Sequence, residues 1–470
     1  MSSLTASLAT ALSGLRADQG ALEATTNNVA NVNTPGYSRE VPVLVTGDPV
    51  VEDPLTFGTG VNLQTIESIR DPILESQIQQ ETETQGQMNA LVSALSQTQS
   101  NFTTTTSDIG TAISNFFDSL NQLSTSPTDS SLRQGVLTAA GDVASAFNTT
   151  ANNLTTQRTN LDASVQQTVG QINQLTTQIA QLNGQISNLA DGGESPGTFV
   201  DQRTQLIDQL SALVDVSVIP TDNTLTLTTA SGTALVAGQQ SFSLTTQLDS
   251  TGVQHIFAQS TDITSTIVSG QLGGLLEARD QQIPAIQTQL DTLAAGLANA
   301  VNGVQTAGYD LNGNPTGPVN SQGNPQNPVY LFTPPSASGS GAAASLSVAI
   351  TDPSLIAASS DGTAGSNGNI EAMYALRDAS VIANQSPTDY YSNIVFNVGN
   401  AASSANAEQT ASNLVLQQLN DQRSSVSGVS LDQEAANMMQ YQQAYAASAQ
   451  VITAINNMMY DVIQMNTLTG

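Results

Sequence analysis

The chain has 470 residues, with nine basic and 38 acidic residues, and its formal charge at pH 7 is −29. It contains no Cys, Lys or Trp and a single His. This composition excludes disulfides, thiolate–metal sites, cysteine nucleophiles, Schiff bases and a phosphate-binding lysine. A strongly acidic chain without a basic stripe is also unsuited to binding nucleic acid or anionic lipid. The length allows two to four domains.

The first 30 residues have the pattern of an amphipathic helix. Leu8, Leu15, Leu22 and Val29 recur every seven residues, which is the spacing of a coiled-coil seam. No basic residue precedes Arg16, so we expect no cleaved secretory signal. No stretch of the chain approaches the 18 apolar residues that would predict a membrane span.

An extended segment follows this helix. Pro35 forces its predecessor out of the helical region, so the helix ends just before it. Val41, Val43 and Val45 then alternate as in a strand, and Pro42 places that strand at a sheet edge or a bulge.

The C-terminal segment repeats the seven-residue pattern. Its stripe consists of Leu431, Met438, Tyr445, Ile452 and Met459. A helix over 429–465 would carry only three charged residues and needs packing partners to be stable. Two interpretations stay open. The terminal helices pair within one chain, or they also pack against neighbouring copies, and the low charge favours the second.

Between the ends, helical periodicity alternates with one β-patterned segment. We expect helices over 73–98, 109–123, 132–189, 201–213, 272–305, 369–379 and 405–424. Asp71-Pro72 is a favoured helix start, and Pro284 kinks or restarts the helix that contains it. Over 214–269, Leu225 and Leu227 alternate with Thr, which is typical of half-buried strands.

The predicted fold is mainly α with a small inserted β domain and a nested architecture. Residues 1–45 and 425–470 form a terminal coiled-coil pair. Residues 46–213 and 270–424 form a helix-rich, bundle-like body, and its segment 309–368, rich in Gly, Pro and Asn, forms long surface loops. Residues 214–269 form the β domain.

The search for chemistry finds no enzyme, cofactor or metal motif. His255 is the only imidazole, and its strand-like surroundings predict a structural or surface role. Residues 310–314 resemble the start of a calcium loop. However, Pro315 stands where Gly is needed and Ser321 where a bidentate Glu is needed. We therefore predict that the protein is not an enzyme.

One motif resembles a known family. Residues 27–30 leading into 31–39 are similar to the N-terminal motif shared by bacterial flagellar rod, hook and hook-associated proteins. The motif positions are Asn31, Asn33, Thr34, Pro35, Gly36 and Tyr37. The C-terminal run 427–445 resembles the hook-associated protein 1 (FlgK) family, as do the interior segments 201–203, 273–280 and 307–313.

This resemblance implies a structural protein that joins the flagellar hook to the filament. Its implied partners are copies of itself in a ring, the hook protein, a second junction protein and an export chaperone, FlgN, on the C-terminal helix. It implies uncleaved type III export to the extracellular flagellum, with no nucleic acid and no membrane insertion. Carried over by position, the assembly seam would be Leu8, Leu15, Leu22, Val29, Leu431, Met438, Tyr445, Ile452 and Met459.

Two alternatives remain at this stage. The chain could be another axial component, such as hook or distal rod protein, and a mostly β body would favour that assignment. The remote alternative is a secreted hydrolase that uses carboxylates brought together from distant segments.

Overall fold

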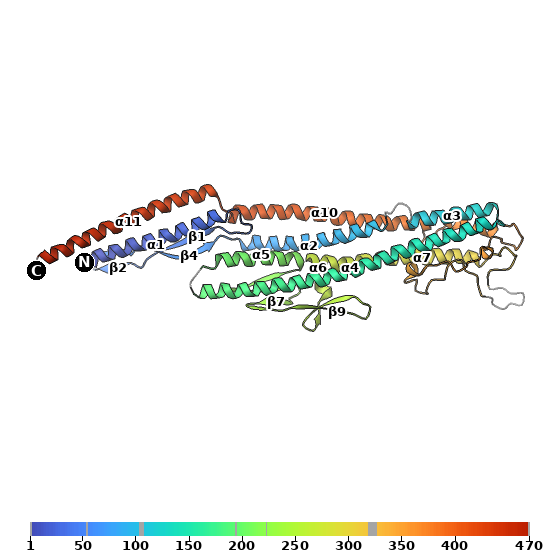
Figure 1. Ribbon diagram of the computed structural model, residues 1–470, viewed down its shortest axis with the longest axis horizontal. Helices are drawn as coiled ribbons and strands as arrows, with labels where there is room; N and C mark the ends of the chain where they lie inside the picture. Colours follow the sequence, from blue (N-terminus) through green and yellow to red (C-terminus); the bar gives the residue numbers. More distant parts are fainter. Residues whose placement is uncertain are drawn as a thin grey trace.

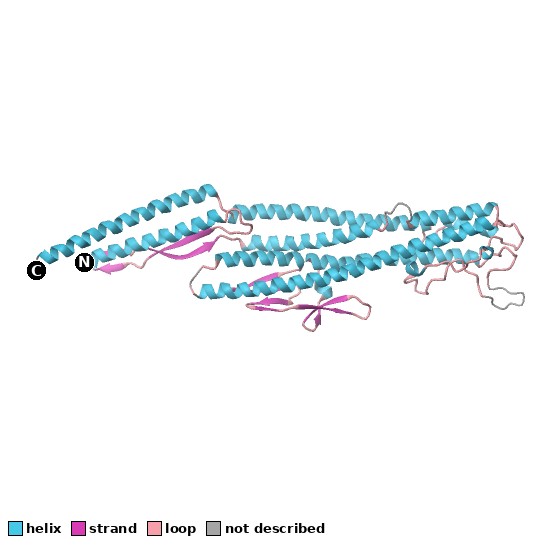
Figure 2. Cartoon of the chain, viewed as in Figure 1, coloured by secondary structure: helices cyan, strands magenta, loops and turns pink. Residues whose placement is uncertain are grey.

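The computed structural model describes residues 2–52, 55–102, 108–192, 195–221, 223–317 and 327–468. The molecule is a long rod of roughly parallel helices, and both chain ends lie at the same tip (Figure 1). Strands are confined to the side of this tip and to one lobe on the side of the rod (Figure 2). The predicted fold class, mainly α with a small β region and a pair of terminal helices, is confirmed.

The tip is built from the two ends of the chain, and we call it the terminal arm. Helix α1 (Ser2–Ala30) packs along α11 (Leu431–Leu468), and on another side it contacts strands β1 (Glu40–Thr46) and β4 (Val61–Ser68). The two strands pair antiparallel, with an irregularity between Val43 and Leu44. Two short strands, β2 (Val50–Glu52) and β3 (Leu55–Phe57), form the end of this hairpin.

Aspartates cap the first three helices of the body. Asp71 accepts hydrogen bonds from the amides of residues 73 and 74 at the start of α2, and Pro72 is the first residue of that helix. Asp108 and Asp129 cap the next two helices in the same way. The first four body helices are α2 (Pro72–Ser100), α3 (Ile109–Thr125), α4 (Ser130–Asp191) and α5 (Gly197–Leu213).

The second half of the body returns along these helices. It contains α6 (Gly270–Glu277), a π-helical turn (Ala278–Gln282), α7 (Ile283–Gln305), α8 (Ala342–Ser345), α9 (Gly368–Tyr374) and α10 (Pro387–Ser427). Pro284 lies in the first turn of α7, directly after the π-helical turn, so the helix restarts there as predicted. Short 3-10 turns lie at 264–266, 353–355 and 375–377.

One hydrophobic cluster spans the body and the β lobe. Among the described residues, its fully buried members run from Met88 to Ala405. The rings of Phe116 and Phe332 lie 5.7 Å apart in a tilted arrangement at its centre. Since no residue of the arm belongs to this cluster, the arm is not joined to the body by a shared apolar core.

The β lobe rests on the side of α4. Strands β5 (Ser217–Thr221), β6 (Thr224–Thr228), β7 (Ala234–Ala237) and β8 (Gln240–Ser241) form a four-stranded antiparallel meander. Strands β9 (Leu244–Leu248), β10 (Gln254–Ala258) and β11 (Thr261–Asp262) form a second sheet. Leu225 and Leu227 are buried on one face, as their alternation predicts. Asn173 and Asn183 of α4 bond the backbone of Leu244 and Leu225, which fixes the lobe to the helix.

Three predicted segments differ from the structure. Helix α10 begins at Pro387, 18 residues before the predicted start, because its outer face is too polar for an amphipathic signal. The segment 309–368 is not confined to the surface, since Leu331, Phe332 and Ile356 are fully buried. Strand β4 lies beside α1, whereas the prediction placed its residues in the helical body. Ser321, the position compared above with a calcium-binding Glu, lies outside the described residues.

Candidate assembly interface

The buried apolar residues of α1 in the arm are small. Ala17, Ala21 and Ala24 are buried on α1, and a Cβ atom at Gly20 would collide with Leu63 of β4. Asp18 approaches Ser448 of α11, with 3.5 Å between the two side-chain oxygens, and burial raises the pKa of the Asp18 carboxyl. Small residues three and four apart let the helix pack closely on both sides.

The predicted seam residues lie beside this contact and are only partly covered. On α1, Leu8, Leu15, Leu22 and Val29 are all half-buried. On α11, the residues of the stripe divide into two groups. Met438, Ile452 and Met459 are half-buried, whereas Leu431 and Tyr445 are 53% and 38% exposed. The chain therefore pairs its own terminal helices, and the structure leaves apolar surface on both of them.

Apolar exposure concentrates in the arm. More than half of the exposed large apolar side chains among the described residues belong to it, although it holds under a quarter of the chain. On α11 these residues are Leu431, Met439, Tyr445, Val451, Met458, Tyr460 and Ile463. Exposed apolar surface of this extent is typical of an interaction site.

The family-like motif folds into the joint between arm and body, around Asn28. The Asn28 side-chain oxygen accepts hydrogen bonds from the Tyr37 hydroxyl at 2.9 Å and the Glu40 amide at 2.8 Å. Its amide group donates to the Glu40 carbonyl at 2.8 Å. Burial and the neighbouring carboxylates, Glu40 first, raise the pKa of Tyr37. The end of α1 and the start of β1 are thereby locked together.

Other motif residues shape the same turn. Asn31 donates to the carbonyl of Asn27 at 3.0 Å, and Thr34 donates to the Asn31 side chain at 3.2 Å. Gly36 has a φ of +75°, and a Cβ atom there would lie 2.6 Å from the Gln205 amide nitrogen. The motif is therefore built for this turn, whereas Asn33, Thr34 and Pro35 remain exposed.

A second set of contacts joins this turn to the body. Asp201 of α5 accepts from the Ser38 amide at 3.1 Å and from the Arg70 guanidinium at 2.6 Å. Arg70 also donates to the Gly197 carbonyl at 3.1 Å, and Gln205 donates to the Pro35 carbonyl. These contacts bridge residues 127 to 170 positions apart in sequence. Sequence patterns did not predict the pairing, although the segment that begins at Asp201 was one of the family-like runs.

Arg39, which directly precedes β1, links the motif turn to the segment between α10 and α11. Its amide donates to the Ser427 carbonyl at 2.9 Å, and its guanidinium donates to the Gln433 side chain at 3.0 Å. The end of α10 and the start of α11 are thereby held beside the motif. These connections between arm and body are all hydrogen bonds.

A cavity of about 470 Å3 opens between the motif turn and the end of α10. Glu75, Asp208 and Arg423 line it, and the Arg423 guanidinium lies 3.7 Å and 3.4 Å from the two carboxylates. Burial, with the neighbouring Glu75 charge, raises the pKa of Asp208 to about 6. The cavity is also lined by hydroxyl side chains such as Ser38, Ser424 and Ser427. None of its described lining residues is a histidine that could activate them.

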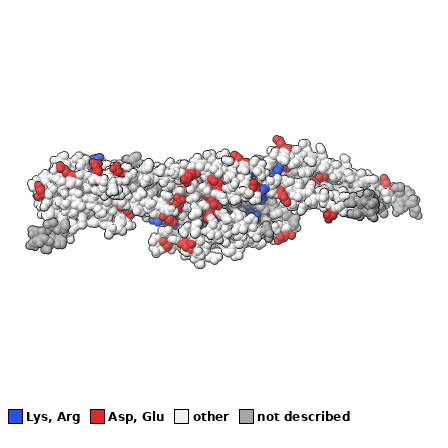
Figure 3. Space-filling view, turned by 180° about the vertical axis from the view of Figure 1, so that it is seen from behind, with Lys and Arg blue, Asp and Glu red and all other residues white. Residues whose placement is uncertain are grey.

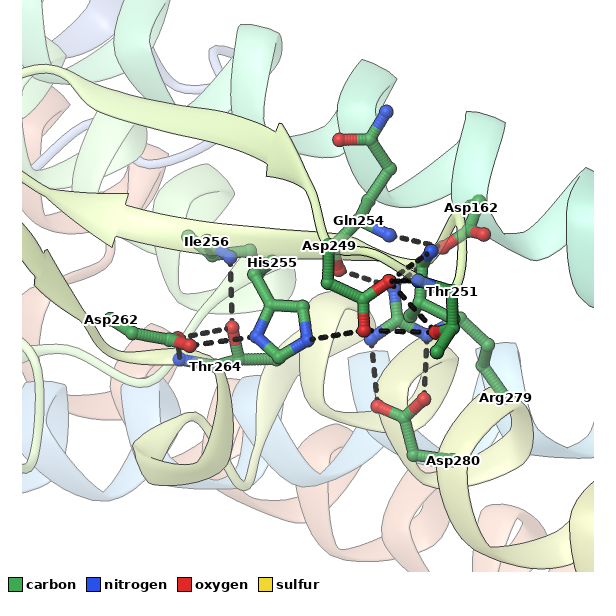
Figure 4. A network of polar contacts seen from close by, with 11 residues as sticks. Asp162, Asp249, Thr251, Gln254, His255, Ile256, Asp262, Thr264, Arg279 and Asp280 are labelled. Atoms are coloured by element: carbon green, nitrogen blue, oxygen red, sulfur yellow. Dashed lines mark hydrogen bonds and ion pairs between the residues drawn. The ribbon is translucent and has the colours of Figure 1, made fainter.

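His255 has a structural role at the β lobe (Figure 4). Its Nδ1 lies 2.7 Å from Asp262 and its Nε2 lies 3.6 Å from Asp249, so the ring bridges two turn residues. Beside it, the buried Arg279 binds Asp162 of α4 at 2.6 Å and Asp280 at 2.7 Å. Arg279 thereby clamps the β lobe to the body, since it also donates to the Gln254 carbonyl at 2.7 Å. The hydroxyls of Thr251 and Thr264 bond the two aspartates, Asp249 and Asp262.

Neither metals nor membranes are indicated. Among the described residues, no three His, Asp or Glu side chains gather as a metal site would require. Within the same ranges, no helix combines the length and apolarity needed to cross a bilayer. Acidic side chains are scattered over the visible face of the rod, and the few arginines gather in small groups (Figure 3).

Comparison with known proteins agrees with this architecture. Residues 95–319 match the flagellar hook-associated protein FlgK helical domain. Residues 8–37 match the flagella basal body rod protein family, and residues 421–465 match the C-terminal family of the rod proteins FlgEFG. The flagellar hook-associated protein 1 of Bacillus subtilis is 30% identical over 98% of this chain and 98% of its own length. The chain belongs to the flagellar hook-associated protein 1 family.

Other members of this family give the same result. The Escherichia coli protein is 27% identical over 95% of this chain and 97% of its own length. The solved structure of the flagellar hook junction protein FlgK from Burkholderia pseudomallei is 19% identical in sequence. Its TM-score is 0.65, and the match covers 75% of this chain and all of that one. The latter likeness supports the fold. Hook-associated protein 1 is a structural flagellar protein, in keeping with the arm described above.

Proposed function

We propose that this chain is a structural subunit of the flagellar hook–filament junction and that its terminal arm packs against neighbouring copies. The observation that carries the proposal is the apolar surface exposed along α11, with Met439, Tyr460 and Ile463 each more than half exposed. A monomer gains nothing from this exposure, whereas a ring of copies would bury it.

The proposed seam is formed by the nine residues carried over from the family. Of these, Leu431 and Tyr445 are the most exposed, and the remaining seven are half-buried. The arm, including the hairpin of β1 and β4, is then the assembling unit. The body, with its inserted β lobe, is the outer part.

The proposal also includes the subunit's binding partners and its export route. Other copies in a ring, the hook protein and a second junction protein would contact the assembled subunit, and the chaperone FlgN would bind the C-terminal helix before export. The chain would reach the extracellular flagellum uncleaved. The proposed role is purely structural, with no enzymatic activity, and its support is the chain's membership of a family of structural flagellar proteins.

The alternatives receive no support. Hook or distal rod proteins were expected to have a mostly β body, whereas helices α2 to α10 dominate this one. For the secreted hydrolase, the paired carboxylates Glu75 and Asp208 share an arginine at the joint and lie between structural elements.

The test is complementation of a strain that lacks this chain. We expect the strain to make hooks without filaments and to release filament protein into the medium, and the wild-type chain to restore motility. Met438→Asp and Ile452→Asp should leave the body folded but block incorporation, because a charge in a packed seam costs several kcal/mol unless it is paired. Leu248→Asp, a matched change on the exposed end of β9, should restore motility. Normal assembly of both seam variants would refute the proposal.

A further inference from the structure

The arginines of this chain hold its elements together, with one exception. Arg70, Arg133, Arg279 and Arg423 each bind residues distant in sequence, and Arg39, Arg158, Arg203 and Arg377 also have partners. Arg16 is exposed and makes no hydrogen bond or ion pair within the described part of the chain. In a chain with nine cations against 38 acids, a cation without an internal partner is unusual.

Arg16 points away from its own α11. Gly14 and Asp18 both approach Ser448 of α11, so they mark the face of α1 that packs on it. Arg16 lies two residues from each, which is about 200° around the helix. It shares this outer face with Leu12, one turn earlier and 39% exposed. We call this surface, with Leu12, Arg16 and Glu23, the outer face of α1.

The outer face of α11 has the opposite charge. Its charged residues are all acidic, and Asp432 and Asp461 are exposed. Asp461 follows the buried Ile455 by six residues, about 240° around the helix, so it lies away from α1. Met439 and Tyr460 expose apolar surface on the same helix. Each chain therefore has an arginine, unpaired among the described residues, beside apolar surface on α1 and exposed carboxylates beside apolar surface on α11, and it cannot bring the two together itself.

We propose that the outer face of α1 in one copy docks on the outer face of α11 in a neighbouring copy, with Arg16 paired to Asp432 or Asp461 of that copy. The inference rests on the proposed function and names the faces in contact. The contact is heterologous, as repeated copies around an axis require. Apolar burial supplies most of the contact, and the arginine sets its orientation and register, because rim charges act mainly on specificity.

The experiment uses charge reversal in the full chain, expressed in the strain that lacks it. Arg16→Glu should reduce the number of filament-bearing hooks by at least about fivefold, since it replaces an attraction by a repulsion at every contact. Arg16→Lys, which keeps the charge, should assemble as the wild type does. Circular dichroism of each purified variant should be unchanged, because Arg16 makes no contact inside the monomer.

The second step identifies the partner. Arg16→Glu combined with Asp432→Arg or with Asp461→Arg should recover assembly in one of the two pairs, and the pair that recovers gives the register. Normal assembly of Arg16→Glu, or failure of both pairs to recover, would overturn the inference. The proposed function is judged separately: it falls if Ile452→Asp and Met438→Asp also assemble, and it stands if they fail while Arg16→Glu succeeds.

Discussion

Asp201 is the residue on which the joint between arm and body depends most. Its carboxylate is 8% exposed and accepts from Arg70 at 2.6 Å and from the Ser38 amide at 3.1 Å. Asp201→Asn keeps the shape and an acceptor for Ser38 but removes the charge opposite Arg70, which is only 18% exposed. A hydrogen bond to a charged, partly buried group contributes about 2 kcal/mol, which corresponds to roughly 30-fold easier opening of the joint.

Hydrogen–deuterium exchange of the purified full chain measures this opening. We expect the amides of Ser38, Arg39 and Ile69 to exchange roughly 30-fold faster in Asp201→Asn, because their acceptors all lie in the joint. Peptides from the core of α4 should not change, since the arm shares no apolar cluster with the body.

The matched control is Asp118→Asn. Its pair with Arg377 has a similar distance, 3.1 Å, but the two side chains are 55% and 37% exposed. An exposed pair contributes at most about 1 kcal/mol, so exchange around it should change little. Unchanged exchange at the joint in Asp201→Asn, or faster exchange throughout the body, would refute the reasoning.

Three further predictions concern stability. Gly36→Ala should destabilise the joint by about 1–2 kcal/mol, because a side chain is strained at positive φ and would meet Gln205. An amide exchange rate at Ser38 equal to that of the wild type would contradict this. Phe116→Ala should lower the free energy of unfolding by about 3–5 kcal/mol, whereas Phe396→Ala, at 68% exposure, should have little effect in denaturant titrations. Burial raises the pKa of Glu83 to about 7, so its stabilising contribution is full below its ordinary value near 4.5 and is lost as the pH rises through 7. Denaturant titrations across this pH range should show that the difference in unfolding free energy between the wild type and Glu83→Gln changes with pH. A difference that stays constant would contradict the raised pKa of Glu83.

The sequence predicted the elements better than their faces. Seven-residue spacing placed α1 and α11 correctly, and the stripe residues of α1 are half-buried. The buried apolar residues of α1 are instead Ala17, Ala21 and Ala24, and their spacing of three and four was a readable signal. Large apolar residues dominate a periodicity analysis, so this signal from small residues was overlooked.

Local signals worked where a single residue sets the backbone. Asp71-Pro72 and Pro284 marked helix starts that the structure contains. The start of α10 had a similar signal, because Ser386 caps it and Pro387 is its first residue. This helix start was not predicted, because the helix is polar on most of its surface and its sequence therefore lacks a clear apolar periodicity.

Contacts between distant segments could not be predicted from the sequence. Asp201 and Arg70 are 131 residues apart. No pattern in the sequence around either residue indicates that the other is its partner. The same holds for Arg279 with Asp162, where the fold buries an ion pair that composition alone makes improbable. The buried anchors Leu331 and Phe332 likewise lie in a segment whose Gly, Pro and Asn content indicated surface loops.

The central claim, that α11 is covered by other copies in the flagellum, can be measured directly because the chain contains no cysteine. Single cysteines at Met439 and Tyr460, both exposed in the monomer, and at Leu248 on the β lobe as a control, can be labelled with a maleimide reagent. The account predicts fast labelling of all three in the purified monomer. In isolated hook–filament structures it predicts strong protection at Met439 and Tyr460 and none at Leu248. Equal labelling of the α11 positions in monomer and flagellum would contradict it.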